Sequence, residues 1–295
     1  MAWLLTEVLP QVQLAERFRQ RVQQGRLLIP GAHDPLAGLL ARAAGFEALY
    51  LSGAALSASM GMPDLGLLTL DEIVGRAQAL VRATGLPLLV DADTGFGEVL
   101  NVVRLGRHLV EAGVVAVQLE DQEMPKRCGH LSGKRLVPPE VMARKVRALK
   151  HLFPTLVIVA RTDAHAIEGM EGVLRRAQIY VDAGADIIFP EALQSLEEFR
   201  MVRKALPVPL LANLTEFGKT PSLGAEDVFA IGYEIALFPV SSLRVAAKAM
   251  QEFYSHLYQH GSSREYLSRM QTRAELYGLI EYSVYEDFDN RLAKA

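Results

Sequence analysis

A loop near the middle of the chain carries residues that could transfer a proton. Cys128, the only cysteine of the chain, lies in the run KRCGH (residues 126–130), soon after the Glu-Asp pair at 120–121. Neighbouring cations favour the thiolate form of a cysteine, so we expect this thiol to exchange a proton near neutral pH. Gly129 and Gly133 would let the loop change shape, as an active-site lid must. The alternative is a surface loop whose cysteine has no role.

Carboxylates end two of the predicted strands upstream of this loop. Asp91 and Asp93 end one strand, and Glu120 ends the next. Side chains at positions i and i+2 of an extended chain point the same way, so we expect the two aspartates to face one spot. Three acids in one place repel each other unless a cation lies between them, and ligands that are all oxygen favour Mg²⁺. The pattern therefore predicts a Mg²⁺ site. The alternative is that these acids cap helices or pair with Arg161.

Other strand ends carry groups that bind anions. Arg161 and Arg244 each present a guanidinium, which can hold a carboxylate through two hydrogen bonds. Further donors at the strand ends are Ser52, Gly53, Asn213 and Thr215. A metal site, several anion donors and an acidic thiol together predict a small polycarboxylate substrate.

A unit that recurs along the chain must position these groups. In each unit a predicted helix is followed by an Ala-Gly or Ile-Gly pair, or by a Leu-Pro or Phe-Pro pair. A short apolar strand comes next, and polar residues follow the strand. The first predicted strand lies at 27–31. The others lie in ALYLSG (48–53), GLPLLVDADTG (85–95), VAVQLED (115–121), LVIVARTDA (156–164), DIIFPEA (186–192), LPVPLLANLTE (206–216) and IALFPVSS (235–242).

Eight strands with helices between them predict an α/β fold, a (β/α)8 TIM-type barrel, as a single domain over residues 1–295. Chemistry in such barrels lies at the carboxyl ends of the strands. The alternative is a doubly wound open sheet, which is disfavoured because no Gly-x-Gly-x-x-Gly follows a strand. Residues 12–24 predict an extra helix before the barrel.

The C-terminal part, from about Ser262, is more polar and helical, and it is surplus to a minimal barrel. Its apolar residues recur at roughly helical spacing, so we expect it to pack on a partner subunit. These residues are Leu267, Met270, Leu276, Leu279 and Ile280.

Composition excludes several classes of protein. The chain has 295 residues, of which 50% are hydrophobic, enough for a large core. The net charge of −3 provides no basic field for nucleic acid or an anionic membrane. One cysteine cannot form an internal disulfide, which suits a reducing cytoplasm. No apolar run reaches the roughly 18 residues that a membrane span needs.

The motifs together resemble those of the isocitrate lyase and phosphoenolpyruvate mutase superfamily, over residues 28–285. The stretches that carry the resemblance are YLSGA, GMPDLG, LLVDADTGFG, QLEDQEMPKRCGH, ARTDA, FPEA, LLANLTEFG and MQTRAELY. Within the superfamily, the chain is most similar to the 2-methylisocitrate lyases of the methylcitrate cycle. Isocitrate lyases share the Cys-Gly-His loop, but they are longer and have a Ser-Pro-Ser segment where this chain has NLTEF (213–217). Phosphonate-forming mutases and oxaloacetate-type hydrolases generally lack the loop.

The resemblance implies a Mg²⁺-assisted lyase that cleaves 2-methylisocitrate to pyruvate and succinate. Mg²⁺ would be held near Asp91 and Asp93, with Asp64 and Glu120 acting through waters. Cys128 would be the general acid on the mobile loop 121–137, and the base is left open between Tyr50 and a metal-linked carboxylate. The other implied substrate contacts are Ser52, Gly53, Ala54, Gly129, His130, Arg161, Glu191, Asn213, Thr215, Ser241 and Arg244.

The resemblance also implies a homotetramer in which paired subunits exchange the last barrel helix. Two positions depart from some relatives: Ala54 replaces a glycine, and Gln118 replaces a histidine, and both changes could alter substrate contacts. Three alternative functions stay open at this point. They are an isocitrate lyase, a carboxyphosphonoenolpyruvate mutase, and a non-catalytic barrel that senses a dicarboxylate.

Overall fold

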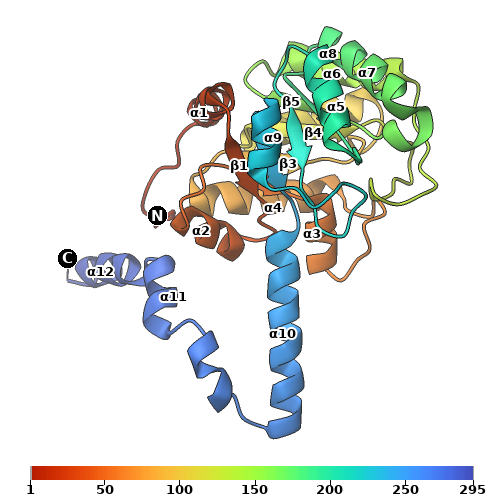
Figure 1. The fold of residues 1–295 in the computed structure, drawn as a ribbon. Coiled ribbons are helices and arrows are strands. Elements are labelled where there is room, and N and C mark those ends of the chain that lie inside the picture. The colour runs from red at the N-terminus through yellow and green to blue at the C-terminus, as the bar shows by residue number, and fades with distance from the viewer. Residues whose placement is uncertain (1, 295) are drawn as a thin grey trace.

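The eight predicted strands form a closed parallel barrel. The computed structural model describes residues 2–294, and these contain β1 Leu27–Pro30, β2 Leu49–Leu51, β3 Leu88–Asp91, β4 Ala116–Glu120, β5 Val157–Thr162, β6 Ile187–Pro190, β7 Leu211–Asn213 and β8 Ile235–Phe238 (Figure 1). Two runs of paired strands, β2-β3-β4-β5-β6 and β7-β8-β1, are joined by parallel bridges between Gly31 and Tyr50 and between Ile188 and Leu210. The barrel prediction is confirmed, and the open-sheet alternative is wrong because the bridges close the ring.

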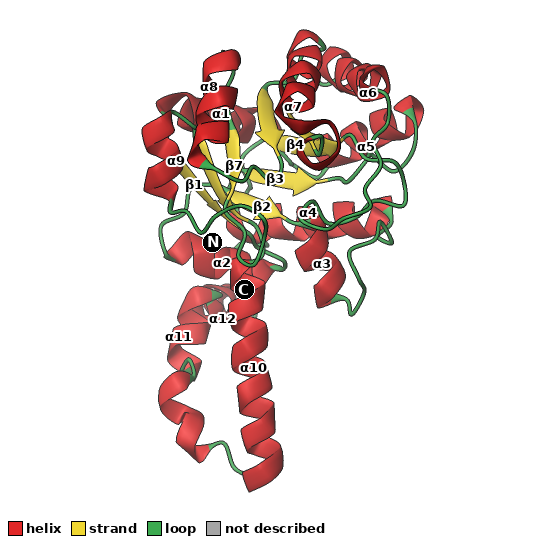
Figure 2. Ribbon diagram, turned by 45° about the vertical axis from the view of Figure 1, so that its right-hand side comes forward, coloured by secondary structure: helices red, strands yellow, loops and turns green. Residues whose placement is uncertain are grey.

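Helices between the strands cover the outside of the barrel (Figure 2). They are α2 Pro35–Ala43, α4 Leu70–Thr84, α5 Val99–Glu111, α6 Pro139–Leu152, α7 His165–Asp182, α8 Leu196–Ala205 and α9 Ala225–Ile231. The short α3 Gly53–Ser59 instead begins beside Asp91, at the carboxyl end of the barrel. The predicted Ala-Gly helix ends are present after α5 and α7. Gly113 and Gly184 there have φ of +83° and +103°, the left-handed conformation that ends a helix most readily at glycine.

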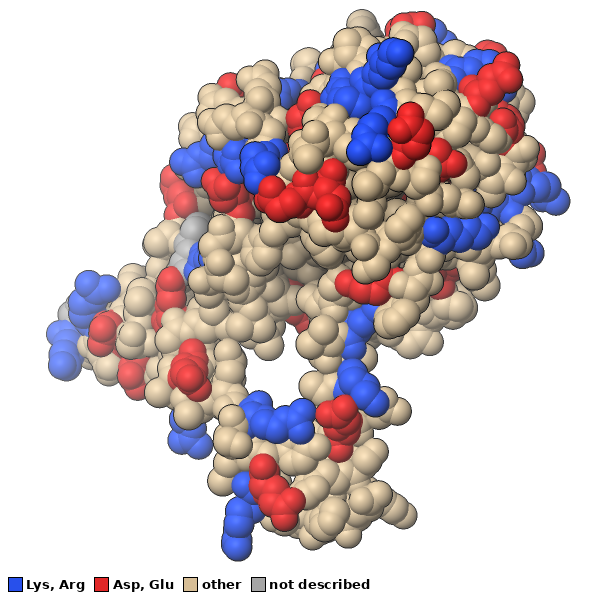
Figure 3. Space-filling view, viewed as in Figure 1, with Lys and Arg blue, Asp and Glu red and all other residues tan. Residues whose placement is uncertain are grey.

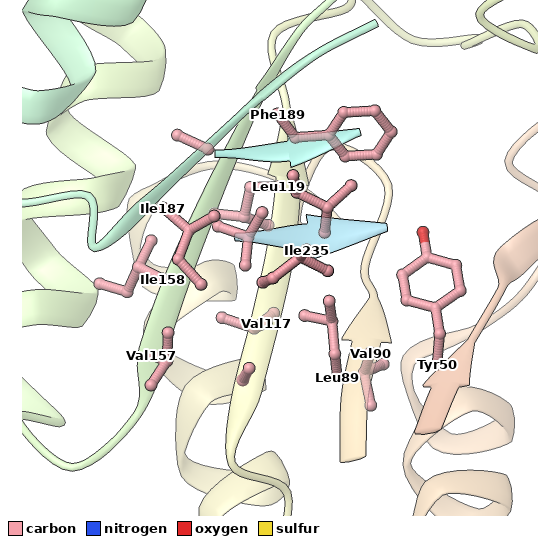
Figure 4. Close-up of a cluster of buried hydrophobic side chains, with 14 of the residues drawn as sticks. Tyr50, Leu89, Val90, Val117, Leu119, Val157, Ile158, Ile187, Phe189 and Ile235 are labelled. Carbon is pink, nitrogen blue, oxygen red and sulfur yellow. The ribbon is translucent and has the colours of Figure 1, made fainter. Parts of the chain in front are cut away.

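Apolar side chains fill the barrel and the layer between sheet and helices. Every residue of β4 and of β5 is buried. These strands are covered on both faces, which explains why they appear in the sequence as continuous apolar runs and not as alternating ones. Figure 4 shows side chains from several strands, among them Leu89, Val117 and Ile235, gathered in one cluster with the ring of Tyr50 beside them.

The predicted leading helix, α1 Gln11–Gln24, contacts the barrel at the amino-terminal ends of two strands. The Gln11 side chain donates to the carbonyl oxygen of Val114, just before β4, at 3.0 Å. Arg19 donates to the carbonyl oxygen of Thr155, just before β5, at 2.9 Å. The helix therefore lies at the end of the barrel opposite to the polar strand ends.

The C-terminal part leaves the barrel and returns to it. α10 Ser241–His260 projects from the barrel with no buried residue, followed by η1 Arg264–Arg269, α11 Arg273–Leu279 and α12 Tyr282–Leu292. The returning segment reaches α2, where Glu281 lies 3.8 Å from Arg42. Figure 3 shows open space between α10 and this segment. None of the helices that residues 2–294 form is long and apolar enough to cross a membrane.

Candidate active site

A cavity of about 430 Å³ lies at the carboxyl ends of the barrel strands. The predicted site residues that line it are Tyr50, Ser52, Ala54, Asp64, Asp91, Cys128, Gly129, His130, Arg161, Glu191, Asn213, Thr215 and Arg244. The other four, Gly53, Asp93, Glu120 and Ser241, lie directly behind this wall. Each of those four contacts a lining residue: Gly53 contacts Asp91, Asp93 contacts Lys126, Glu120 contacts Arg161, and Ser241 contacts Glu216.

Asp91 and Asp93 lie close together because of a turn. β3 ends at Asp91, and Asp93 has φ of +47° with its backbone N–H donating to Asp91 Oδ1 at 3.2 Å. A Cβ built on Gly53 would lie 3.3 Å from Asp91 Oδ2 and 3.4 Å from Asp93 Oδ1, so both carboxylates border the same glycine. The two carboxylates therefore face one spot, as the sequence predicts, although Asp93 is not extended, because it lies in a turn in which Gly95 N–H donates to the carbonyl oxygen of Ala92. An aspartate that accepts a hydrogen bond from the residue two positions on is a common local turn.

Asp64, Asp91, Asp93 and Glu120 form an acidic corner of the site. Gln118 connects Tyr50 to this corner. Its side-chain oxygen accepts a hydrogen bond from the Tyr50 hydroxyl at 2.8 Å, and its side-chain nitrogen donates to Asp91 Oδ1 at 3.1 Å. Gln118 is fully buried and does not line the cavity. Its effect on substrate is therefore indirect, since it orients Tyr50 and Asp91. Burial, with the nearby Asp91 carboxylate, also raises the pKa of Tyr50 well above its ordinary value.

The acidic corner carries more carboxylates than cations. Lys126 reaches it from the loop, contacting Asp64 and lying 2.8 Å from Asp93 Oδ1. Burial and the neighbouring Asp91 raise the pKa of Asp93 to about 6, against the pull of Lys126. Burial likewise raises the pKa of Glu120 well above its ordinary value, although Arg161 opposes the shift. The corner would therefore be stabilised by additional positive charge.

These residues fit Mg²⁺ by their chemistry. Every candidate ligand is a carboxylate oxygen, and Glu120 Oε1 is buried without a hydrogen-bond partner among residues 2–294. Within the same described range, no three His, Cys, Asp or Glu side chains form a group that could hold an ion directly. Mg²⁺ keeps several waters and binds proteins through one or two carboxylates, so it does not require such a group.

Arg161 lies between the acidic corner and the opposite wall. Its guanidinium is close to three carboxylates: Nε lies 2.8 Å from Asp163 Oδ2 and 3.4 Å from Glu120 Oε2, and Nη1 lies 3.0 Å from Glu191 Oε2. Glu191 also accepts hydrogen bonds from Asn213 at 3.2 and 3.3 Å. A buried guanidinium needs such partners, because its desolvation is costly otherwise.

The loop 121–137 folds over the cavity, and Cys128 lines the cavity from this loop in a half-buried position. The neighbouring basic residues have other partners. Lys126 lies on Asp93, Arg127 donates to the carbonyl oxygen of Ser132 at 3.3 Å, and His130 Nε2 lies 3.2 Å from Glu191 Oε1. The basic side chains that the sequence places next to the thiol therefore contact carboxylates and the backbone.

The far wall of the cavity holds the predicted anion donors. Arg244 Nη1 donates to Thr215 Oγ1 at 3.2 Å and to Glu216 Oε2 at 2.8 Å. Ser241 also donates to the Glu216 carboxylate. A carboxylate of the chain thus already contacts two predicted anion donors, and a substrate carboxylate would have to compete with it.

Sequence reasoning missed several residues that shape the site. Gln118 was noted only as a departure from relatives, and Lys134, Asp163 and Glu216 had no assigned role. Asp163 could have been found, since it ends a strand in the motif ARTDA. Lys134 carries no such signal, because a lysine in a polar loop usually lies in water.

Comparisons with known proteins identify relatives of this chain in sequence and in fold. The family model described as phosphoenolpyruvate phosphomutase matches residues 18–258. A 2-methylisocitrate lyase of Halalkalibacterium halodurans is 54% identical over 100% of this chain and 98% of its own. The crystal structure of a 2,3-dimethylmalate lyase superposes with a TM-score of 0.88 at 33% identity, covering 95% of both chains. A phosphonopyruvate hydrolase, whose structure contains oxalate and Mg²⁺, superposes with a TM-score of 0.85 at 28% identity, covering 96% of this chain and 99% of its own.

We predict that Gln118→Met destabilises the protein. The substitution keeps the side-chain volume but leaves the buried Tyr50 hydroxyl without its partner, which should lower the free energy of unfolding by about 1–3 kcal/mol. Urea denaturation measures this change. Gln178→Met is the control, because Gln178 is exposed on α7 and its side chain donates to Asp182 at 2.8 Å. Equal stabilities of the two variants would contradict the bridging role of Gln118.

Proposed function

This chain belongs to the phosphoenolpyruvate mutase and isocitrate lyase superfamily, and from that premise we propose that it cleaves 2-methylisocitrate into pyruvate and succinate. The observation that carries the proposal is the 54% identity with a 2-methylisocitrate lyase over the whole chain, supported by a cavity whose lining includes Cys128, Arg161 and Arg244. A free thiol of this kind suits a reducing cytoplasm.

The cavity has polar and apolar walls, which suit the carboxylates and the methyl group of this substrate. Charged and polar groups would hold its three carboxylates. Phe189, Leu237 and Pro239 line the same cavity and offer apolar surface, against which the substrate methyl group could lie. A site with both features favours 2-methylisocitrate over isocitrate, which lacks the methyl group.

The reaction breaks the bond between the hydroxyl-bearing carbon and its neighbour. A base takes the hydroxyl proton, the oxygen becomes the carbonyl of pyruvate, and the electron pair of the broken bond stays on the succinate half as a carbanion. Arg161, Asn213 and Arg244 would stabilise that charge on a carboxylate of the substrate. Cys128 would then protonate the carbanion. The loop excludes water, which would otherwise compete as the proton donor.

The base stays open between two candidates. Tyr50 lines the cavity, but its hydroxyl donates to Gln118, and burial with Asp91 raises its pKa. It could act as a base only if additional positive charge offset that shift. A carboxylate linked to the proposed metal is the alternative, since an ionised carboxylate can accept the hydroxyl proton.

Mg²⁺ is the cofactor that we propose. A superfamily relative has been crystallised with this ion, and the oxygen-rich corner of this chain suits it. Asp91 and Asp93 would hold the ion, with Asp64 and Glu120 acting through waters. When bound, Mg²⁺ would supply Lewis acidity that makes the substrate hydroxyl easier to deprotonate.

We also propose that the active assembly is a homotetramer built from pairs of chains that exchange α10. The helix carries exposed apolar residues along its length, including Val245, Met250, Tyr254 and Tyr258. An apolar surface of this kind usually marks a contact with another protein. A second copy of the chain could cover it by lying in the open space between α10 and the returning segment (Figure 3).

The substrate proposal is tested by comparing kcat/KM for 2-methylisocitrate and isocitrate in the presence of Mg²⁺. One buried methyl group is worth roughly 1–3 kcal/mol, so 2-methylisocitrate should be favoured by about 10–200-fold. Formation of succinate, the product common to both substrates, is followed by chromatography, because isocitrate yields glyoxylate in place of pyruvate. Equal or reversed values would move the assignment to an isocitrate lyase, and turnover of phosphonates would move it to a mutase. Tight binding without turnover would indicate a sensor.

The metal proposal predicts that Asp93→Asn raises the Mg²⁺ concentration needed for half-maximal activity. The amide keeps the shape of the side chain but loses the charge that attracts the ion. A titration of activity with Mg²⁺ measures the shift, with Asp71→Asn as control because Asp71 lies in the first turn of α4, outside the cavity lining. If the wild-type protein stays fully active in EDTA, the metal proposal fails.

The assembly proposal predicts that a chain ending at residue 261 forms smaller or aggregated species. The deletion removes η1, whose Tyr266 ring packs on Phe253 of α10, together with α11, which contacts α2, and α12. Light scattering coupled to size-exclusion chromatography gives the mass of the assembly. A truncated chain that keeps the wild-type assembly would contradict the proposal.

A further inference from the structure

The loop over the cavity has a fixed base and a separate tip. Gln122 and Leu136 form an antiparallel bridge, Glu123 N–H donates to the carbonyl oxygen of Arg135 at 2.8 Å, and Val137 N–H donates to that of Asp121 at 3.0 Å. These bonds make the two ends of the loop into a short hairpin stem. Residues 124–134 form the tip, which carries Cys128.

Lys134 lies where the tip returns to the stem, and it is buried beneath the tip. Its ammonium group donates to the carbonyl oxygen of Gly129 and lies 2.9 Å from Asp163 Oδ1. The side chain of Lys134 is 2% exposed and that of Asp163 is fully buried. Lys134 does not line the cavity, so it cannot touch the substrate there.

Asp163 is itself fixed by the barrel. Its carboxylate accepts two hydrogen bonds from Arg161, at 2.8 and 3.1 Å, and its backbone N–H donates to Asp121 Oδ1 at 2.9 Å. Burial alone would raise the pKa of Asp163, but Arg161 and Lys134 lower it to about 2, so the carboxylate is charged at neutral pH. The anchor that Lys134 contacts is therefore rigid and negative.

The backbone of Gly129, the other partner of Lys134, has little room to move. A Cβ at this position would lie 2.6 Å from Arg161 Nη2 and even closer to Glu191, so the backbone lies directly against both side chains. Its carbonyl oxygen accepts from Lys134. Because Cys128 precedes Gly129, a shift of this peptide group would move the thiol relative to the cavity.

We propose that Lys134 is the positioning residue for Cys128: its ammonium links the Gly129 carbonyl oxygen to Asp163 and thereby holds the loop tip over the cavity. This inference rests on the proposed function only for its kinetic consequence, the delivery of a proton by Cys128. The link between loop and barrel is a property of the chain without substrate. It accounts for a buried lysine that the proposed reaction does not use directly.

Lys134→Met is the variant that tests this link, and Arg135→Met is its matched control. Arg135 is the next residue and also a cation, but its side chain is 73% exposed and pairs with Glu123. Lys134→Met should still fold, because Asp163 keeps the two hydrogen bonds from Arg161 and is not left unpaired. Thermal unfolding of both variants checks this point.

The first measurement is the rate at which iodoacetamide alkylates Cys128 in the ligand-free protein. Cys128 is the only thiol, so the rate reports one site. Release of the tip should raise the rate at least 5-fold in Lys134→Met and leave it unchanged in Arg135→Met. Loss of a nearby cation would by itself slow alkylation by disfavouring the thiolate, so an increase reports access to the thiol. A rate equal to that of the wild type would overturn the proposal.

The second measurement separates positioning from a purely structural role. With 2-methylisocitrate, kcat of Lys134→Met should fall by about 10–100-fold, because a small misplacement of a catalytic group is costly, while KM changes less than about 3-fold. A KM change with unaltered kcat would overturn the proposal.

If Lys134→Met does not fold, Lys134→Gln takes its place, since it removes the charge but keeps a polar side chain. Wild-type alkylation and kcat in a folded Lys134→Gln would then overturn the requirement for the ammonium. If the wild type does not cleave the substrate, the proposed function fails, and the alkylation result still decides on Lys134.

Discussion

The guanidinium of Arg161 is the charge on which both halves of the site depend. It pairs with Glu120 on the side of the acidic corner, with Asp163 under the loop, and with Glu191 on the side of His130. All of these groups are buried, so each relies on the others for the charge balance that water would otherwise provide. The barrel makes this possible, because the ends of adjacent strands bring side chains from distant parts of the sequence within a few ångströms.

The site divides the work between a fixed floor and a loop that covers it. The floor consists of strand ends, whose backbones the barrel fixes, and it carries the acids, Arg161 and the anion donors. The loop contributes the thiol and two lysines, Lys126 and Lys134, each of which lies on a carboxylate of the floor. Closing the loop therefore brings positive charge to an acidic surface. This attraction gives a physical reason for the loop to lie over the cavity.

The sequence predicted the barrel and most of the lining of the cavity, because apolar strands that end in polar residues are a local pattern. It predicted less well what depends on contacts across the site. The i and i+2 argument brought Asp91 and Asp93 together, but the real cause is a turn at Asp93 with φ of +47°. The cations next to Cys128 were expected to act on the thiol, yet Lys126 pairs with Asp93 instead. The role of Gln118 could not be predicted, because Tyr50 and Asp91 lie on other strands far away in the sequence. That of Lys134 depends on Asp163, which lies 29 residues further on, directly after β5.

The central claim is that Cys128, held over the cavity by the loop, donates the proton that completes cleavage. The most direct test is the steady-state kinetics of Cys128→Ser with 2-methylisocitrate and Mg²⁺. A serine hydroxyl has nearly the same shape as the thiol but is a far weaker acid. The variant should bind Mg²⁺ normally, and its kcat should fall by about 10²–10⁴, the usual contribution of a positioned acid, while KM changes much less. A kcat within a few-fold of the wild type would contradict the claim.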